Sequence, residues 1–510
     1  MSSLCPVQVS RSGYRPREPE GTALYRVMTD HLETFVARVE SEGGRLPHFV
    51  TRELRRFLEC GIRAHGFVRV RCPDCRYEMA VPFSCKGRGF CPSCGGRFMA
   101  QTAAHLTDRV LPDVPWRQWV LTLPYPLRYR VAYDPSLQSL LLRTFVSTLE
   151  RWQKSRATEA GLDNPRWGAV TVIQRFGSAL QLTPHFHTLG MDGVYDIDAN
   201  RGSARFHPLA PPTTDEVEQL AHRVRARVLT SLVRRGVLSL ETDEWLEPDA
   251  LSPQEPAMAA CYGAAIQGRF AFGERAGQRL ARLGRVDPMM DPTSGFEDRR
   301  PLAARSFGFD LHAGVAVPAG SRPALERLCR YIARPPLSHD RLELREDGQI
   351  ALQLKRPFSD GSTHMLFTPQ ALIERLCALI PRPRTHRVRY HGLLAPAARF
   401  RRLVVPDPDA SPCAAGEPAP SSPEPPPNGS SSTAAKRWRW ILWAELLKRV
   451  FDIDVLDCPK CHGRMRPIAA IMKADVINAI LECLGHDTEA PPIRPARAPP
   501  EHALVELDWT

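Results

Sequence analysis

Two Cys-x-x-Cys pairs near the N-terminus constrain the fold of this chain more than any other feature. Cys72-Pro-Asp-Cys75 and Cys91-Pro-Ser-Cys94 are separated by 15 residues. Each pair can place two thiolates on one turn, and four thiolates complete the tetrahedral shell of a structural Zn²⁺ site. We therefore predict one structural zinc site made of Cys72, Cys75, Cys91 and Cys94. Cys60, His65 and Cys85 lie beside these pairs, where they are candidates to replace a ligand or to bind a second ion; the alternative is that they are small buried residues without a metal.

A third pair of the same spacing, Cys458-Pro-Lys-Cys461, lies near the C-terminus. It supplies half of a second zinc site, for which Cys483 and His486 are the candidate partners. The sequence shows no signal peptide and no apolar run long enough to span a membrane. We therefore expect a cytoplasmic protein, in which such cysteine pairs bind metal rather than form disulfides.

The chain has 510 residues and a formal net charge of +12. A basic chain of this size suggests a polyanionic partner, commonly nucleic acid, although a merely basic surface is the alternative. Basic residues also surround the cysteine pairs, so this segment either contacts phosphates or is a zinc ribbon that docks a protein. These residues are Arg63, Arg69, Arg71, Arg76, Lys86, Arg88 and Arg97.

Changes in composition and periodicity divide the chain into five parts. We expect a disordered N-terminus, a helical and zinc-binding domain, a domain of mixed strands and helices, a Pro/Ser-rich linker, and a C-terminal module with the second cysteine site. The expected bounds are 1–22, 23–110, 115–405 (with a helical insertion at 213–300), 406–436 and 437–510.

The segment His185-Phe186-His187 lies in a run that alternates like a β-strand. Residues two apart in a strand point to the same face, so both imidazoles project together while Phe186 packs into the core. Two neutral imidazoles at this spacing suit a divalent metal. The alternative is a strand with two solvent-facing histidines.

A helix is predicted after Pro323, and it must end near Arg334 because prolines follow. Tyr331 falls in its last turn, between Arg327 and Arg334. A phenol flanked by arginines is suited to a phosphate, although a tyrosine that covers the edge of the core would show the same pattern.

Residues 375–406 contain eight arginines and no acidic residue, with Tyr390 embedded among them. Arg387 and Arg389 lie in the densest part. Arginines interleaved with an aromatic ring suit a nucleic-acid backbone, and a solvated basic loop is the alternative.

Seven motifs in this order resemble the rolling-circle transposases of the insertion-sequence-91 family, most of all the branch associated with common-region elements. The resemblance extends from about residue 45 to residue 500, apart from the linker. It implies an α+β fold in which a nuclease domain of the HUH type (histidine, hydrophobic residue, histidine), with a ferredoxin/RRM-like antiparallel sheet, follows an N-terminal zinc-binding domain. The motifs are FSCKGRGFCPSCGGR, RQWVLTLPYPLRY, VTVIQRFG, HFHTLGMDGVY, RYIARPPLSHDRL, DGSTHMLFTP and YHGLLAP.

The resemblance also implies roles for individual residues. Tyr331 would be the nucleophile that forms a 5′-phosphotyrosine, and His185 and His187 would bind Mg²⁺ or Mn²⁺. Gln174 and Asp192 are the candidates for a third ligand, and we favour Gln174 because a neighbouring antiparallel strand can bring its amide beside the histidines. Members of the two-tyrosine branch carry a second tyrosine one helical turn away. Here those positions are Arg327 and Pro335, so we expect a one-tyrosine variant.

The function implied is nicking and rejoining of single-stranded DNA at transposon ends and in target DNA. The expected location is the bacterial cytoplasm at the nucleoid, with host replication proteins as further partners. The main alternative is a non-catalytic zinc-dependent DNA-binding protein, which needs the cysteines and arginines but neither the histidines nor Tyr331. A barrel metallohydrolase is disfavoured because no regular alternation of strands and helices follows residue 200, and the intact histidines and Tyr331 argue against an inactive remnant.

Overall fold

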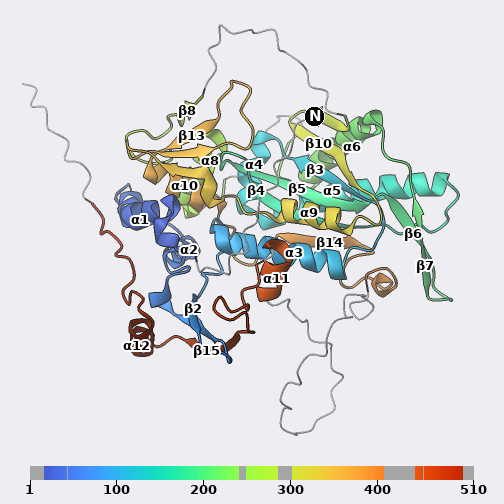
Figure 1. Cartoon of the computed structure of the whole chain (residues 1–510). Coiled ribbons are helices and arrows are strands. Elements are labelled where there is room, and N and C mark those ends of the chain that lie inside the picture. The colour runs from blue at the N-terminus through green and yellow to red at the C-terminus, as the bar shows by residue number, and fades with distance from the viewer. Residues whose placement is uncertain are drawn as a thin grey trace, which may run out of the picture.

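A six-stranded antiparallel sheet lies at the centre of the protein (Figure 1). The computed structural model describes residues 17–42, 44–239, 249–284, 301–406, 443–451 and 453–497. Strand β5, which carries the two histidines, lies inside the sheet between β4 and β3. The strand order is β14 (Val388–Gly392), β4 (Gly168–Phe176), β5 (Leu182–Met191), β3 (Trp116–Thr122), β10 (Phe309–Val317) and β9 (Ala303–Ser306).

One face of this sheet is covered by α5 (Pro135–Glu159) and α6 (Thr214–Arg234). Phe186 of β5 stacks on Phe145 of α5, with ring centroids 6.5 Å apart. Because side chains alternate along a strand, the packing of Phe186 against α5 directs His185 and His187 to the opposite face. The predicted strand and the predicted direction of its histidines are confirmed.

The histidine face is covered by α9 (Arg322–Ala333), which packs in turn on α3 (Pro92–Arg109). As predicted, α9 stops at its prolines, because a residue before proline avoids the helical region and Arg334 is extended at φ −57° and ψ 153°. The N-terminal turn of α3 lies directly against this end. A Cβ added to Gly95 would lie 2.5 Å from the Cβ of Pro335, so only glycine allows the two helices to approach so closely.

A second core joins the N-terminal helices to a four-stranded antiparallel sheet from the second half of the chain. The segment predicted as a helical insertion is therefore divided, because α6 covers the central sheet whereas α8 belongs to this second core. The helices of this region are α1 (Ala23–Ser41), α2 (His48–Leu58), α4 (Tyr125–Tyr133), α7 (Leu251–Gln254), α8 (Pro256–Gln267) and α10 (Pro369–Leu379). The strands are β11 (Leu342–Leu344), β12 (Ile350–Gln353), β13 (His364–Phe367) and β8 (Arg282–Leu283).

A three-stranded sheet pairs a strand from the C-terminal part of the chain with two strands from the N-terminal part. Figure 1 shows the red strand β15 (Arg466–Ile471) beside the blue strands of the N-terminal region, where it pairs with β1 (Phe67–Arg71), which pairs with β2 (Glu78–Pro82). Helices α11 (Trp443–Phe451) and α12 (Ala474–Leu484) flank β15 in the sequence, and a separate ribbon, β6 (Gly193–Asp198) with β7 (Ser203–Pro208), projects from the central domain.

Two predicted segments fall largely outside the described residues. They are the disordered N-terminus at 1–22, described only from residue 17, and the linker at 406–436, described only at residue 406. Among the described helices, none is both long enough and apolar enough to cross a membrane.

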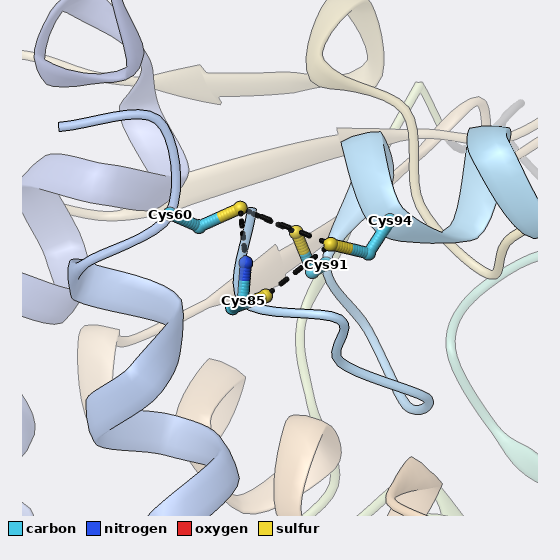
Figure 2. A group of neighbouring side chains, drawn as sticks. All are labelled: Cys60, Cys85, Cys91 and Cys94. Atoms are coloured by element: carbon cyan, nitrogen blue, oxygen red, sulfur yellow. Dashed lines mark hydrogen bonds between the residues drawn. The ribbon is translucent and has the colours of Figure 1, made fainter. Parts of the chain in front are cut away.

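Four buried cysteines lie between α2, β2 and α3, and their sulfur atoms face one another (Figure 2). The Sγ–Sγ distances are 3.7 Å for Cys60–Cys91, 3.8 Å for Cys60–Cys94 and 3.4 Å for Cys85–Cys94. A tetrahedron with Zn–S bonds of about 2.3 Å has sulfur–sulfur edges of about 3.8 Å, so this set fits one structural zinc ion.

The zinc ligands are grouped differently from the predicted set. Cys91 and Cys94 lie with Cys60 and Cys85, whereas Cys72 and Cys75 lie with Cys458 and Cys461. The reason is geometric: Cys72 and Cys75 occupy the turn between β1 and β2, at the far end of the hairpin from the start of α3. Cys60 and Cys85, expected either as substitutes or as ligands of a second ion, therefore belong to the N-terminal cluster. Cys483 and His486, the expected partners of Cys458, belong to no such cluster among the described residues.

We predict that Cys85→Ser lowers the zinc content by one ion per chain and lowers the temperature of unfolding, because three thiolates leave an incomplete structural site. Zinc content is measured by mass spectrometry of the metal in the purified protein. Cys261→Ser is the matched control, because Cys261 is also buried but lies on α8 outside both clusters. Unchanged zinc in Cys85→Ser would contradict this ligand set.

Candidate active site

The two histidines of β5 form the centre of the site. Their ring centroids are 4.8 Å apart, and His187 is buried while His185 is only partly covered. Burial lowers the pKa of His185 to about 4 and lowers the pKa of His187 well below its ordinary value, and nearby Arg334 acts in the same direction on both. Both imidazoles are therefore neutral at pH 7, as metal ligands must be.

The Nδ1 atom of each histidine is engaged, which leaves Nε2 as the coordinating atom. Nδ1 of His185 lies 2.7 Å from the carbonyl oxygen of Thr183, to which it donates. Nδ1 of His187 lies 2.6 Å from the amide nitrogen of Gln118 on β3, which donates to it as placed; with the amide turned by 180°, Nδ1 would donate to the amide oxygen and leave the Nε2 lone pair free. Nε2 of His187 is buried and has no hydrogen-bond partner in the described structure. A buried polar atom of this kind is costly unless a ligand satisfies it.

Gln174, the favoured third ligand, lies directly across from His185 in the pairing of β4 with β5. Its Nε2 donates to the carbonyl oxygen of Ile332 on α9 at 2.5 Å. Its Oε1 is buried without a hydrogen-bond partner. Two buried polar atoms without hydrogen-bond partners, a glutamine oxygen and an imidazole nitrogen on neighbouring strands, fit a divalent cation such as Mg²⁺ or Mn²⁺.

Asp192, the other candidate ligand, is excluded by its position. Its carboxylate forms a bidentate ion pair with Arg117, at 2.7 Å and 3.0 Å, at the opposite end of β5 from His185. Both residues are buried, and a third contact from Arg117 to the carbonyl oxygen of Ala313 at 2.9 Å fixes the guanidinium. The carboxylate oxygens of Asp192 are therefore used to neutralise a buried cation.

Tyr331 lies at the mouth of the site. Its ring centroid is 6.2 Å from that of His187, and its side chain is 50% exposed. The guanidinium of Arg334 lies 4.3 Å from the centre of the tyrosine ring, and Nε and Nη1 of Arg334 are buried without hydrogen-bond partners. The phenol is thus accessible to a large substrate and adjacent to unsatisfied cationic donors.

Further basic residues surround this mouth. Arg128 of α4 is close enough to lower the pKa of His185. Burial, with Arg334 and Arg341 nearby, lowers the pKa of Lys355 to about 8. A bound anion would stabilise the charged forms of these neighbouring cations.

The other predicted DNA-binding arginines occupy different places. Arg327 is exposed on α9, one turn before Tyr331. Arg387 stacks on Phe98 of α3 at 3.6 Å and donates to the carbonyl oxygen of Arg88 at 3.0 Å. By its register with Thr171, Arg389 projects to the sheet face opposite the histidines.

Arg387 and Phe98 line a cleft of about 660 Å³ between the segment before α3, α3 itself and the segment before β14. The walls combine cations with one aromatic ring, and burial lowers the pKa of Arg387 to about 10, with Arg88 contributing. Such a cleft can accept phosphate and stack a base. Its basic and aromatic lining residues are Lys86, Arg88, Arg97, Phe98, His386 and Arg387.

Gln118 was not identified from the sequence as a site residue. The signal available was its polarity within an apolar strand, in the run Trp-Arg-Gln-Trp-Val-Leu-Thr of β3. Only the register of β3 on β5 places that amide diagonally across from His187. A buried glutamine outside any known motif cannot be assigned a role from the sequence, because its role depends on which strand pairs with its own.

Comparisons with known proteins agree with both parts of this description. Residues 27–123 match a family described as "Transposase zinc-binding domain", and residues 168–402 match one described as "Putative transposase". The chain is 24% identical over 444 residues to the transposase for insertion sequence element IS801 of Pseudomonas savastanoi pv. phaseolicola, an alignment that covers 85% of this chain and 87% of the relative. No solved structure gives a significant match. The first match contains the N-terminal cysteine cluster and the second contains the histidines and Tyr331, and together they show that the chain belongs to the insertion-sequence-91 family of transposases.

Proposed function

We propose that this transposase nicks and rejoins single-stranded DNA as an HUH endonuclease with one catalytic tyrosine. The observation that carries the proposal is the convergence of His185, His187 and Gln174 on one sheet face, with an exposed Tyr331 beside them. An antiparallel sheet with the histidine strand in its interior also supports this class of nuclease fold.

In the cleavage step, the phenol oxygen of Tyr331 attacks the scissile phosphorus and the bond from phosphorus to the 3′ oxygen breaks. The phenol loses one proton and the departing 3′ oxygen gains one, so a 5′-phosphotyrosine and a free 3′-OH result. A divalent cation held by His185, His187 and Gln174 would polarise the phosphate oxygens. Attack of a 3′-OH on the phosphotyrosine reverses the step and joins strands, so no external energy source is required.

Arg334 would bind the scissile phosphate. Two observations support this role: Nε and Nη1 of Arg334 have no hydrogen-bond partner among the described residues, and the guanidinium lies against the Tyr331 ring. Charge-assisted hydrogen bonds from arginine to phosphate are strong and fix its orientation. Arg128 and Lys355 would add to the positive potential at the mouth.

The DNA strand would extend from the active site to the cleft lined by Arg387 and Phe98. That cleft adjoins the cysteine cluster through Cys94, so the zinc-binding region would contribute to recognition of transposon ends. Arg327 would contact the backbone near the nucleophile. Arg389 stays a predicted DNA contact, on the other face of the sheet.

The use of Tyr331 rather than Tyr390 follows from their surroundings. Tyr390 packs against the main hydrophobic core, and burial raises its pKa. A nucleophile for a polymeric substrate must reach the surface, as Tyr331 does. The alternative, a zinc-dependent DNA-binding protein without catalysis, gives no reason for unsatisfied metal-type ligands beside an exposed tyrosine.

We predict that the wild-type protein forms a covalent adduct with end-labelled single-stranded DNA from the element's terminus, in the presence of Mn²⁺, and that Tyr331→Phe abolishes it. The double variant His185→Ala/His187→Ala is expected to lose the adduct as well, because it removes two metal ligands. The adduct is detected as labelled protein on a denaturing gel.

Tyr125→Phe is the matched control, since Tyr125 is exposed to a similar degree, 48%, and should keep the adduct. An adduct that persists in Tyr331→Phe would refute the assigned nucleophile. DNA binding without any adduct in the wild type, on several terminal sequences, would favour the non-catalytic alternative.

A second prediction concerns Gln118. When a cation takes the lone pair of His187 Nε2, Nδ1 carries the proton, so the Gln118 amide must present its oxygen to it. The oxygen and nitrogen of a side-chain amide are similar in size, so a 180° rotation of the Gln118 amide exchanges them with little change in packing. Removing such a supporting group typically weakens metal binding about 10- to 100-fold.

Gln118→Leu should therefore weaken Mn²⁺ binding by about this factor, measured by titration calorimetry, whereas Gln118→Glu keeps an acceptor and should retain most of the affinity. Gln153→Leu is the control, because Gln153 is equally buried but its amide donates to the carbonyl oxygen of Met191. Equal affinities of Gln118→Leu and the wild type would show that Gln118 does not orient His187.

A further inference from the structure

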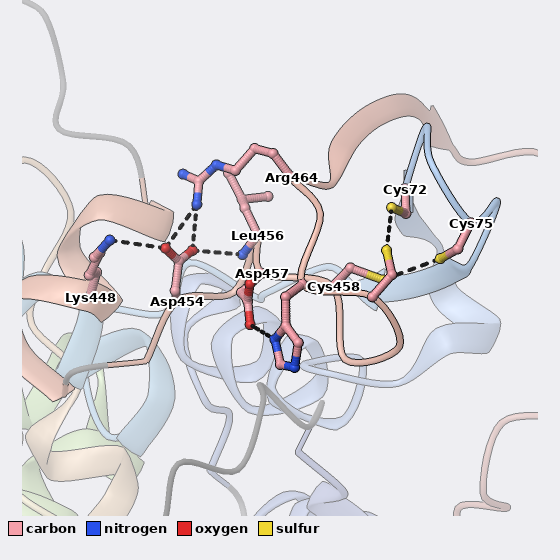
Figure 3. A network of polar contacts seen from close by, with 10 residues as sticks. Cys72, Cys75, Lys448, Asp454, Leu456, Asp457, Cys458 and Arg464 are labelled. Carbon is pink, nitrogen blue, oxygen red and sulfur yellow. Dashed lines mark hydrogen bonds and ion pairs between the residues drawn. The ribbon is translucent and has the colours of Figure 1, made fainter. Parts of the chain in front are cut away.

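We propose that Cys72, Cys75, Cys458 and Cys461 bind a second zinc ion that joins the two ends of the chain. The pairs lie 389 and 383 positions apart in the sequence, yet Sγ of Cys72 is 3.5 Å from Sγ of Cys461, and Sγ of Cys75 is 3.5 Å from Sγ of Cys458. All four sulfur atoms lie within 4.8 Å of one another. Figure 3 shows Cys72 and Cys75 facing the turn that contains Cys458.

These distances fit the thiolate shell of a tetrahedral metal site. Four thiolates about 2.3 Å from Zn²⁺ lie about 3.8 Å from one another. Two disulfides do not explain the set, because disulfide sulfurs are bonded at about 2.0 Å. A closed shell of four cysteines leaves no open position, so the ion would be structural.

The two turns that carry the cysteines have the same backbone geometry, which is an independent sign of a shared ligand. In each turn, the residue after the second cysteine donates its N–H to the carbonyl oxygen of the first cysteine, at 3.1 Å from Arg76 to Cys72 and at 2.9 Å from His462 to Cys458. Arg76 and His462 both have left-handed backbones, with φ of 61° and 57°. Residues other than glycine adopt this conformation infrequently. Its occurrence at both equivalent positions indicates that the two turns are built alike, as expected for two Cys-x-x-Cys turns that bind one metal ion.

Polar contacts hold the C-terminal turn in place (Figure 3). The carboxylate of Asp454 accepts from Lys448 at 3.1 Å, from Arg464 at 2.8 Å and from the backbone of Leu456 at 3.1 Å. The turn itself approaches the other half closely, because a Cβ on Gly463 would lie 2.1 Å from the carboxylate of Asp74. The turn that carries Cys72 and Cys75 and the turn that carries Cys458 and Cys461 are therefore in close contact around their sulfur atoms.

The apolar contacts between the two ends are few. One cluster contains Val70, Met79 and Met465 around the buried Cys72 and Cys458, and another places Ile477 and Leu481 of α12 on Phe67 and Ala80. A third small cluster places Leu446 of α11 on Ala100 and Ala104 of α3. A core of this size cannot by itself stabilise an independent unit, and small modules of this kind commonly depend on a metal. Each Cys-x-x-Cys turn supplies only two ligands, so neither end completes the site alone.

It follows that the C-terminal module is part of the N-terminal zinc-binding region, and that the second zinc site of this region is complete only when the C-terminal cysteines are present. The pairing of β15 with β1 along five residues of β1 adds to this junction, as do the packing of Leu446 of α11 on α3 and the ion pairs of Arg449 with Asp108 and Glu326. This inference rests on the cysteine geometry and is independent of the proposed nuclease activity.

The first test counts zinc in the full-length protein. The wild type should contain two ions per chain, and both Cys72→Ser/Cys75→Ser and Cys458→Ser/Cys461→Ser should contain one. Cys483→Ser is the matched control, since Cys483 is an exposed cysteine of the same module outside the cluster, and it should retain two. One ion in the wild type, or two in the Cys458→Ser/Cys461→Ser variant, would overturn the proposal.

The second test asks whether the two ends of the chain stay associated after the segment between them is cut, first in protein whose cysteines are unchanged. A protease site is inserted between Pro420 and Ser421, in the Pro/Ser-rich segment of the full chain, and the protein is cleaved and passed over a sizing column. The two fragments should co-elute with two zinc ions. Separation of the wild-type fragments while both ions remain bound would overturn the proposal, even if the cysteine variants fail to fold. Cleaved Cys458→Ser/Cys461→Ser should release the C-terminal fragment, and cleaved Cys483→Ser should not.

Discussion

The antiparallel pairing of β5 with β4 and β3 is the constraint on which the site depends. Alternation along β5 sends Phe186 to α5 and both histidines to α9. The pairing with β4 then sets Gln174 across from His185, and the pairing with β3 brings Gln118 to His187. Because a shift of one residue would turn these side chains to the opposite face, the register determines the proposed metal site as strictly as the identity of its residues does.

The tyrosine is held by a different set of contacts, which connects it to the cysteine cluster. Gln174 donates to the carbonyl oxygen of Ile332, directly after Tyr331, and so fixes the end of α9 on the sheet. From the other side, Gly95 allows α3 to approach Pro335. Since Cys91 and Cys94 begin α3, a zinc ion in their cluster would hold the helix against which α9 rests. The zinc-binding region therefore supports the position of Tyr331, the proposed nucleophile, as well as the cleft beside it.

Local patterns in the sequence predicted much of the central sheet and the candidate site, because strand alternation, a proline-terminated helix and a histidine pair are encoded by neighbouring residues. The strand at β5, the end of α9 and the common face of His185 and His187 were predicted in this way. The grouping of the cysteines was not. A Cys-x-x-Cys turn specifies two ligands but not its partner turn, and the partner of Cys72 lies almost at the other end of the chain. Gln118 and Arg128 could not be identified for the same reason, since their roles depend on which strand and helix lie next to β5.

The most direct test of the central claim is to identify the amino acid that carries the DNA. Trypsin cleaves after Arg330 but not before Pro335, so Tyr331 is recovered in the peptide 331–341, which contains no other tyrosine. After reaction with single-stranded DNA and Mn²⁺, nuclease digestion and tandem mass spectrometry should find a 5′-nucleotide phosphate on Tyr331 in that peptide. A nucleotide on any other residue, for example on Tyr390 in the peptide 390–399, would contradict the account.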